Sequence, residues 1–235
     1  MSLYERMHRW FWKPVRWFFR IRVHGTPPEE RFPEGPVLLC CNHYSAVDPI
    51  CLCAALPRIH PHFMAKKELF KIPLLNRLIR ALGAFPIARG AGDIGAIRET
   101  IHLLEKGKSI GLFPQGHRFS KVKPSREQFQ DGASLIALRS GCPIIPVFLF
   151  SKNYRFCLFR RVEVVFGEPI LPEDIRQSHD ENGLGGVTDL LYERLGYLQS
   201  QVPNYERLIQ GVRSVPALPA GRRNNKEKKS TCQKS

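Results

Sequence analysis

The sequence predicts an α/β fold: a single domain with a largely parallel, mixed sheet flanked by helices. The prediction rests on two observations. Short apolar runs of strand length alternate along the chain with longer segments whose apolar residues keep helical spacing. The length of 235 residues suits one such domain with a substantial core. No apolar run reaches the roughly eighteen residues that a membrane span needs.

The individual elements follow from local patterns. The expected strands are short apolar runs bounded by turn residues: 37–41, 61–65, 84–88, 109–113, 144–150 and 162–167. The expected helices are 49–56, 73–82, 93–106, 131–140 and 187–201. The helix at 93–106 has clear limits, because Asp93 can begin it and Gly107 can end it. Strands that alternate with helices favour a parallel sheet.

Residues 1–25 are predicted to form a separate amphipathic helical segment that associates with a membrane. Within residues 4–22, basic residues at alternating spacings of three and four form one helical stripe: Arg6, Arg9, Lys13, Arg16 and Arg20. Positions 10–19 also hold six aromatic residues, more than one packed face usually uses. Such a helix suits the interface of an anionic bilayer. The alternative is a helix packed on the domain with its basic face in solvent.

The rest of the chain divides into a domain at 26–212 and a basic tail at 213–235. The tail has few apolar residues and is expected to be disordered. A net charge of +15 implies an anionic partner, which could be a nucleic acid, an anionic membrane or a phosphorylated substrate. No nucleic-acid-binding motif is recognisable, so a nucleic acid partner is not expected.

The cysteines indicate a reducing compartment. There are seven, an odd number without paired C-x-x-C spacing, which argues against a disulfide framework or a structural zinc site. Cys40, Cys41, Cys51 and Cys53 lie in apolar runs and are expected to be small buried hydrophobic residues. The segment His60-Pro61-His62 could place two imidazoles on one face, but no third ligand is evident. We therefore expect neither a metal nor a cofactor.

The most informative stretch runs from Asn42 to Asp48, directly after the apolar run 37–41. His43 and Asp48 are five residues apart, so on an α-helix their side chains would point apart. Pro49 favours a bend, because it pushes Asp48 towards extended geometry. A carboxylate on one imidazole nitrogen leaves the other free as a general base. The alternative is that Asp48 is only the N-cap of a helix.

Three further blocks follow this pair: Gly83 to Arg89, Phe113 to Ser120, and Pro143 to Val147. In this order the blocks resemble the glycerophospholipid acyltransferase family, in particular its 1-acylglycerol-3-phosphate (lysophosphatidate) acyltransferases. The resemblance covers about residues 35–170 and includes the segment from Met64 to Phe70.

The resemblance implies transfer of a fatty acyl group from acyl-CoA or acyl carrier protein to the free hydroxyl of 1-acylglycerol-3-phosphate. The product would be phosphatidic acid, made in phospholipid biosynthesis. His43 would be the general base and Asp48 its orienting partner, and no covalent intermediate is required. Together with the N-terminal segment, this predicts a peripheral protein on the cytoplasmic face of the cell membrane.

Cationic residues in the other blocks are candidates for binding the acceptor. Arg89 and Arg118 are the best candidates for the phosphate, because a guanidinium can contact it through two hydrogen bonds. The resemblance assigns their blocks to the acceptor. Gly116 would permit a tight turn and a close approach of the backbone to substrate. Lys66 and Gln115 complete the predicted substrate-binding set.

The third block departs from the family pattern, which usually reads Phe-Pro-Glu-Gly-Thr-Arg-Ser. Here Gln115 replaces the glutamate, His117 replaces the threonine, and Phe119 displaces the serine by one position. Gln115 keeps the hydrogen-bonding shape of glutamate without its charge. The acceptor is therefore open: another lysophospholipid or a polyol is one alternative, and a catalytically silent lipid-binding homologue is another.

Overall fold

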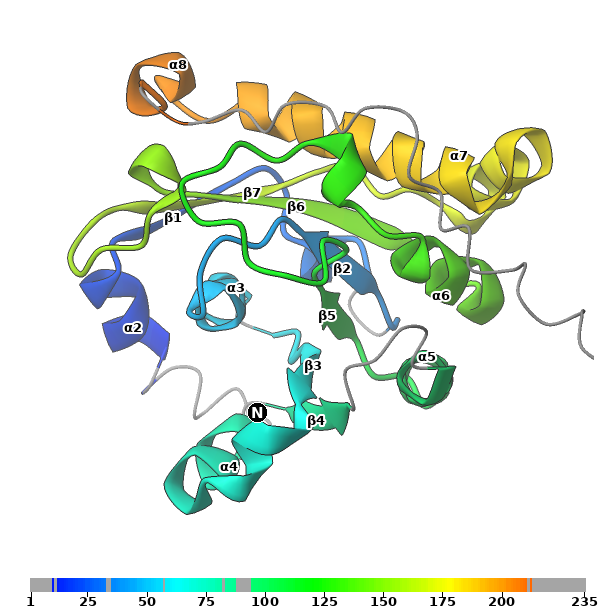
Figure 1. Cartoon of the computed structure of the whole chain (residues 1–235), viewed down its shortest axis with the longest axis horizontal. Helices are drawn as coiled ribbons and strands as arrows, with labels where there is room; N and C mark the ends of the chain where they lie inside the picture. Colours follow the sequence, from blue (N-terminus) through cyan, green and yellow to red (C-terminus); the bar gives the residue numbers. More distant parts are fainter. Residues whose placement is uncertain are drawn as a thin grey trace, which may run out of the picture.

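A seven-stranded sheet with the order β1-β7-β6-β2-β5-β3-β4 forms the centre of the protein (Figure 1). The computed structural model describes residues 10, 12–32, 35–56, 58–81, 83–87, 94–210 and 212. The strands are β1 (Ile21–His24), β2 (Leu38–Cys41), β3 (His62–Lys66), β4 (Ala84–Ile87), β5 (Ile110–Leu112), β6 (Ile144–Phe150) and β7 (Val162–Phe166).

Neighbouring strands run parallel except for β6 and β7, which are antiparallel. This confirms the predicted α/β fold with a largely parallel sheet. Because β1 is parallel to β7, it runs opposite to β2 and β6. The starts of β1 and β7 therefore lie at the edge of the sheet where β2, β3, β4, β5 and β6 end. We call this edge the carboxyl edge.

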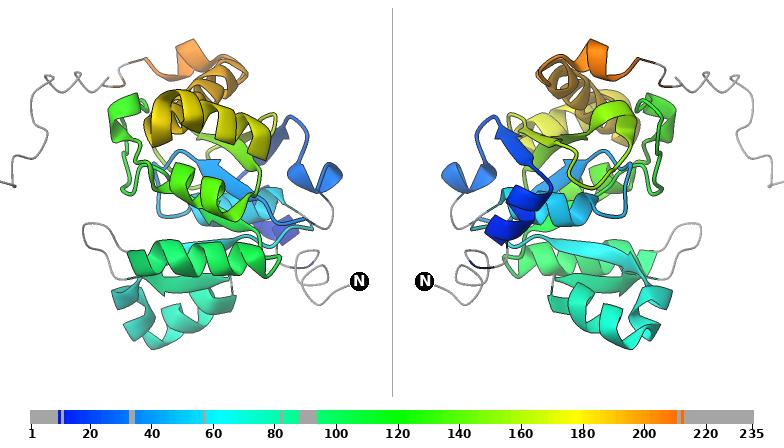
Figure 2. Two further views of the ribbon diagram at one scale, coloured as in Figure 1. Left: turned by 90° about the vertical axis from the view of Figure 1, so that its right-hand side faces the viewer. Right: turned by 90° about the vertical axis from the view of Figure 1, so that its left-hand side faces the viewer.

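Helices cover both faces of the sheet. Helices α2 and α3 lie on one face, and α6 and α7 lie on the other (Figure 1). Figure 2 shows α4 and α5 at one end of the molecule and α7 and α8 at the other. The helices are α2 (Lys13–Phe18), α3 (Asp48–Ala55), α4 (Pro73–Ala81), α5 (Ile94–Glu105), α6 (Gly132–Ser140), α7 (Pro172–Ser200) and α8 (Tyr205–Leu208). Short 3₁₀ helices are η2 (Pro28–Glu30), η3 (Lys67–Lys71), η4 (Arg126–Gln128) and η5 (Lys152–Tyr154).

The core is centred on strands that are covered from both sides. Every residue of β2, β6 and β7 is buried. Strand β6 reads Ile-Ile-Pro-Val-Phe-Leu-Phe without polar alternation, as expected where helices cover both faces. Within the described part of the chain, no helix combines the length and the apolar character needed to cross a membrane.

The predicted strands all coincide closely with observed ones, but one helix was placed too late. The helix predicted at 187–201 begins at Pro172, and Gly183 (φ 67°, ψ −166°) interrupts it. The early part was missed because it is polar: Ile175 is its one buried residue before Gly183, so apolar periodicity gave no signal. Pro172 in the first turn, with Asp174 beside it, was the available start signal.

The N-terminal prediction needs a correction over residues 19–24. The basic stripe was extended through Arg20, but helix α2 ends at Phe18 and Arg20 has a φ of 47°. Ile21–His24 instead forms edge strand β1, in which Ile21 is buried and lies opposite Val162. Sheet pairing therefore overrides the helical pattern here. Residues 1–9, 11 and the tail at 213–235 lie outside the described residues, and membrane association of the N-terminal segment remains a prediction.

A buried carboxylic acid, Glu29 in η2, links folding to pH. Its residue is 5% exposed, and burial raises its pKa from 4.5 to about 7, although the backbone N–H groups of Glu29 and Arg58 oppose the shift. Burial penalises the carboxylate form more than the neutral acid. The folded protein therefore holds a proton on Glu29 at pH values where the unfolded chain has lost it.

We predict that Glu29 destabilises the fold as pH rises. The raised pKa means that its contribution is most favourable below 4.5 and is lost between about 4.5 and about 7. Glu29→Gln should gain about 2 kcal/mol in free energy of unfolding relative to wild type when the pH is raised from about 5 to about 8. Urea unfolding at both pH values measures this. Glu30→Gln changes the exposed neighbour and serves as the control; a pH-independent difference for Glu29→Gln would refute the prediction.

Candidate functional site

Asn42 fixes the chain where it leaves β2. Its side chain is buried and continues the sheet sideways: Nδ2 donates to the Leu149 carbonyl (2.8 Å), and Oδ1 accepts from the Leu149 N–H (2.7 Å). The amide thus replaces one step of backbone pairing with β6. No role was predicted for Asn42 from the sequence, although it lies in the motif that contains His43 and Asp48. Its neighbour His43 is held at the carboxyl edge as a result.

His43 and Asp48 meet as predicted. His43 Nδ1 lies 2.7 Å from Asp48 Oδ2. The same oxygen accepts hydrogen bonds from the backbone N–H groups of Tyr44 and Ser45, both at 2.8 Å. The chain between the two residues is bent so that both side chains face each other. Asp48 begins α3 but caps nothing there: Val47 is the N-cap residue, and no side chain caps the helix. The N-cap alternative is therefore wrong.

The electrostatics of the pair are set by burial. Asp48 is 1% exposed, and this burial raises its pKa, while the hydrogen bonds from His43, Ser45 and Tyr44 oppose the rise. A desolvated carboxylate binds a proton donor more strongly than a hydrated one. Because Nδ1 faces this carboxylate, it carries the proton in the neutral imidazole, and Nε2 is left with a lone pair.

The loop after β5 holds the imidazole from the other side. The His43 ring stacks on Phe113 with ring centroids 4.1 Å apart and an interplanar angle of 21°. The His43 carbonyl accepts from the Phe119 N–H (2.9 Å), and its N–H donates to Gln115 Oε1 (2.6 Å). The His43 side chain is 13% exposed. Nε2 has no hydrogen-bond partner among the described residues, so it is available to a ligand.

Gln115 is buried and bonds to the backbone of the loop that carries His43. It is 2% exposed, Oε1 receives the His43 N–H, and Nε2 donates to Gln128 Oε1 (2.6 Å). Both polar ends are therefore used within the protein. A substrate-binding role was predicted for Gln115, whereas in the structure its side chain supports the His43 backbone. Its partner Gln128 was missed because nothing in its local sequence marks it.

The predicted turn at Gly116 is present. Gly116 has a φ of 64°, and a Cβ there would lie 3.2 Å from Gln130 Nε2. Arg118 follows on the exposed side of the turn, and its guanidinium forms no ion pair with a described carboxylate. The turn thus presents a free cation next to the strand end that carries Phe113.

The remaining predicted cations come from neighbouring strand ends. Lys66 is the last residue of β3, and its Nζ lies 3.7 Å from Glu68 on an exposed surface. Arg89 lies outside the described residues, two positions after the end of β4. Strands β2, β5, β3 and β4 are neighbours in this order. His43, Phe113 and Lys66, which are far apart in sequence, therefore lie at the carboxyl edge, where α/β sheets usually bind ligands.

The cysteines near the pair are not suited to act as nucleophiles. Cys40, Cys41, Cys51 and Cys53 are free and buried, which confirms the prediction that they are core residues. Burial raises the pKa of each thiol, that of Cys53 to about 12. A thiol with a raised pKa is a poor nucleophile. Across the residues that the structure describes, no three His, Cys, Asp or Glu side chains gather as metal ligands.

The sequence is similar to those of known proteins. A family model described as Acyltransferase matches residues 20–149. The chain is 28% identical over 177 residues to the 1-acyl-sn-glycerol-3-phosphate acyltransferase of Bacillus subtilis, covering 74% of this chain and 87% of that protein. It is 35% identical over 161 residues to the enzyme of the same name from Streptococcus pneumoniae, covering 67% of this chain and 58% of that protein.

A solved structure agrees with the fold. The crystal structure of the 1-acyl-sn-glycerophosphate (LPA) acyltransferase PlsC from Thermotoga maritima superposes with a TM-score of 0.56 at 25% identity. It covers 81% of this chain, and this chain covers 83% of it. The family model spans more than half of the chain and contains both His43 and Asp48, and the chain therefore belongs to the acyltransferase family of enzymes.

Proposed function

We propose that the protein transfers a fatty acyl group from a thioester donor, acyl-CoA or acyl carrier protein, to the free hydroxyl of 1-acylglycerol-3-phosphate. The observation that carries this proposal is the His43–Asp48 pair at the carboxyl edge, in which Asp48 is buried and His43 Nε2 bonds to no described residue. The choice of acceptor follows from the relatives, which are named for this reaction. The product is phosphatidic acid, so the enzyme contributes to phospholipid biosynthesis.

The chemistry follows from the geometry of the pair. The acceptor hydroxyl donates its proton to His43 Nε2 while its oxygen attacks the thioester carbonyl carbon. Asp48, hydrogen-bonded to Nδ1, stabilises the imidazolium that forms. The tetrahedral intermediate then breaks its carbon–sulfur bond, and the leaving thiolate takes the proton from Nε2. The hydroxyl replaces the serine of a hydrolase triad, so no covalent enzyme intermediate and no cofactor are required.

Binding of the acceptor falls to the cations at the same edge. Arg118 is exposed and forms no ion pair with a described residue, and a guanidinium can hold a phosphate through two hydrogen bonds. We assign the acceptor phosphate to Arg118 with Arg89, and a supporting role to Lys66. Since acceptor and product are lipids, we further propose that the enzyme works as a peripheral protein on the cytoplasmic face of the cell membrane.

The experiment that tests this function is an acyl-transfer assay on the purified protein. Labelled acyl-CoA and acyl carrier protein are each offered with lysophosphatidate, with other lysophospholipids and with glycerol. Labelled phosphatidic acid as the main product supports the proposal. A preference for another acceptor would assign the altered Gln115–Phe119 block to that acceptor, and a complete lack of transfer would favour a lipid-binding homologue without activity.

Substitutions in the catalytic pair should abolish most activity and leave the fold intact. We predict that His43→Ala and Asp48→Asn each lower kcat by about 10² to 10⁴-fold. Asparagine can still accept the Tyr44 and Ser45 N–H groups, but it cannot stabilise an imidazolium with a full charge. Ser45→Ala is the matched control, since its hydroxyl only accepts from the Val47 N–H (3.3 Å). A folded His43→Ala variant with wild-type kcat would exclude the mechanism.

Gln115 should act on kcat and not on acceptor binding. Gln115→Leu removes the acceptor of the His43 N–H and leaves this group buried without a partner, which costs about 1–3 kcal/mol. We expect kcat to fall about tenfold or more while the KM for the acceptor stays unchanged. Gln115→Glu keeps an acceptor for that N–H and should retain more activity. A raised KM for the acceptor with an unchanged kcat would instead show that Gln115 binds substrate.

Arg118 should instead govern acceptor binding. Arg118→Ala should raise the KM for lysophosphatidate about tenfold or more and leave the KM for the acyl donor unchanged. Arg118→Lys should recover only part of the loss, because a lysine cannot form the paired hydrogen bonds of a guanidinium. Arg139→Ala, on the exposed surface of α6, is the control. Equal changes in both KM values would argue against a phosphate contact by Arg118.

A further inference from the structure

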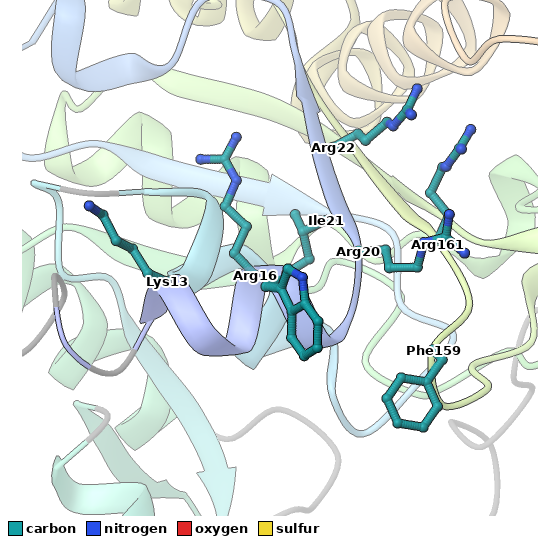
Figure 3. A pocket seen from close by; sticks show the side chains of 8 residues that line it. Lys13, Arg16, Arg20, Ile21, Arg22, Phe159 and Arg161 are labelled. Atoms are coloured by element: carbon teal, nitrogen blue, oxygen red, sulfur yellow. The ribbon is translucent and has the colours of Figure 1, made fainter.

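A second feature of the carboxyl edge is an open cavity of about 670 Å³ beside helix α2 (Figure 3). It lies between α2, the start of β1 and the segment that precedes β7. Its lining contains no acidic residue and five cations: Lys13, Arg16, Arg20, Arg22 and Arg161. We call this the basic cavity. Neither the proposed mechanism nor the predicted acceptor site uses any of these side chains.

The positive charge of the basic cavity is poorly balanced. Arg161 lies 3.9 Å from the Glu163 carboxylate, but this carboxylate is also bonded to His24 (2.7 Å). The other four cations form no ion pair with a carboxylate in the described part of the chain. Gathering cations around one space costs Coulomb energy unless an anion enters it. The charge therefore favours an anionic ligand.

The rim of the basic cavity is apolar and exposed, which selects among anions. Trp17 is 79% exposed and Phe159 is 56% exposed, and both line the cavity. Leu158, next to Phe159, is 57% exposed. The ring centroids of Phe159 and Phe18 are 4.7 Å apart, so the loop before β7 and helix α2 form one surface. Exposed aromatic residues beside cations suit the interface of a bilayer better than a soluble anion.

Phe159 also adopts an unusual backbone conformation. Its φ is 59°, in the left-handed region that bulky residues rarely enter. Such a conformation costs free energy and persists only where the surrounding structure imposes it. Here it presents an aromatic ring at the surface when burial would be more favourable. This supports a role for the ring in contact with a partner.

The position of the basic cavity separates it from the acceptor site. Strand β1 is three places away from β2 in the sheet, which is about 14 Å at the usual strand spacing. In a glycerol phosphate, only two carbon atoms separate the reacting hydroxyl from the phosphate oxygen. One acceptor molecule therefore cannot reach His43 and fill the basic cavity at once. The occupant must be a second molecule at the same edge.

We propose that the basic cavity binds the phosphate of an anionic phospholipid headgroup in the bilayer and thereby seats the carboxyl edge on the membrane. This inference rests on the proposed function at a membrane surface and extends it from the N-terminal segment to the Leu158–Arg161 loop. The bound lipid is not a substrate. It orients the enzyme so that His43 faces the layer in which the acceptor lies.

Vesicle binding by the full-length protein tests the proposal. The probes are vesicles of phosphatidylcholine alone and of an equimolar mixture with phosphatidylglycerol. Arg16→Gln/Arg22→Gln should lower the affinity for the mixed vesicles about 10- to 30-fold. The matched pair Arg98→Gln/Arg139→Gln removes the same charge from α5 and α6 and should lower it less than about threefold. Equal losses in the two pairs would overturn the proposal, because only net charge would then matter.

A second variant tests the apolar rim. Phe159→Asn relieves the left-handed backbone, since asparagine tolerates this region, and removes the aromatic ring. It should lower vesicle affinity about 3- to 10-fold, and this loss should persist at high salt, where charge contacts are screened. Wild-type affinity in this variant would contradict the proposal, as would tighter binding of wild type to duplex DNA than to mixed vesicles.

An activity measurement separates this proposal from the proposed enzymatic function. Acyl transfer to lysophosphatidate dispersed in detergent micelles should be unchanged in Arg16→Gln/Arg22→Gln, because no bilayer is needed there. If wild type is inactive in micelles, the proposed acyltransferase function is refuted. The vesicle measurement then still tests whether the basic cavity binds an anionic lipid. If wild type is active and the variant binds mixed vesicles normally, the cavity proposal fails alone.

Discussion

One carboxylate oxygen, Asp48 Oδ2, is the point on which the reactive end of this protein depends. It is buried and receives three hydrogen bonds, from His43 Nδ1 and from the N–H groups of Tyr44 and Ser45. A buried charge is tolerated only where such donors compensate for lost water. The loop must therefore bend around the carboxylate, and the bend places the imidazole with Nε2 outward. The hydrogen bonds that compensate for the buried charge of Asp48 therefore also fix the orientation of the imidazole.

The glutamine at position 115 fits this constraint. The His43 N–H needs an acceptor, and Gln115 provides one without adding charge next to the buried Asp48. Its amide also donates to Gln128, which a carboxylate could not do. The site thus contains a single buried anion surrounded by neutral hydrogen-bonding groups. Like charges in low dielectric oppose each other's ionisation, so a neutral support keeps Asp48 available to His43.

The antiparallel pairing of β6 and β7 determines which elements lie at the carboxyl edge. Strand β7 is antiparallel to β6, and β1 is parallel to β7. The start of β1 and helix α2 therefore lie at the same edge as the ends of β2, β5 and β3. A fully parallel sheet would have placed them at the opposite edge. His43 and the exposed aromatic and basic surface therefore lie at the same edge of the sheet, as the proposed action on a membrane lipid would require.

The sequence alone determined six of the seven described strands, most helices and the His43–Asp48 pair, because these depend on local patterns: apolar periodicity, and a histidine and an aspartate five residues apart directly after a strand. It did not reveal β1 or the polar first half of α7, where pairing and capping outweigh periodicity. Only the tertiary structure brought Gln115 to His43 and Leu149 to Asn42, contacts that span 72 and 107 residues. Such contacts depend on strand order, which burial of the whole sheet decides and no local pattern records.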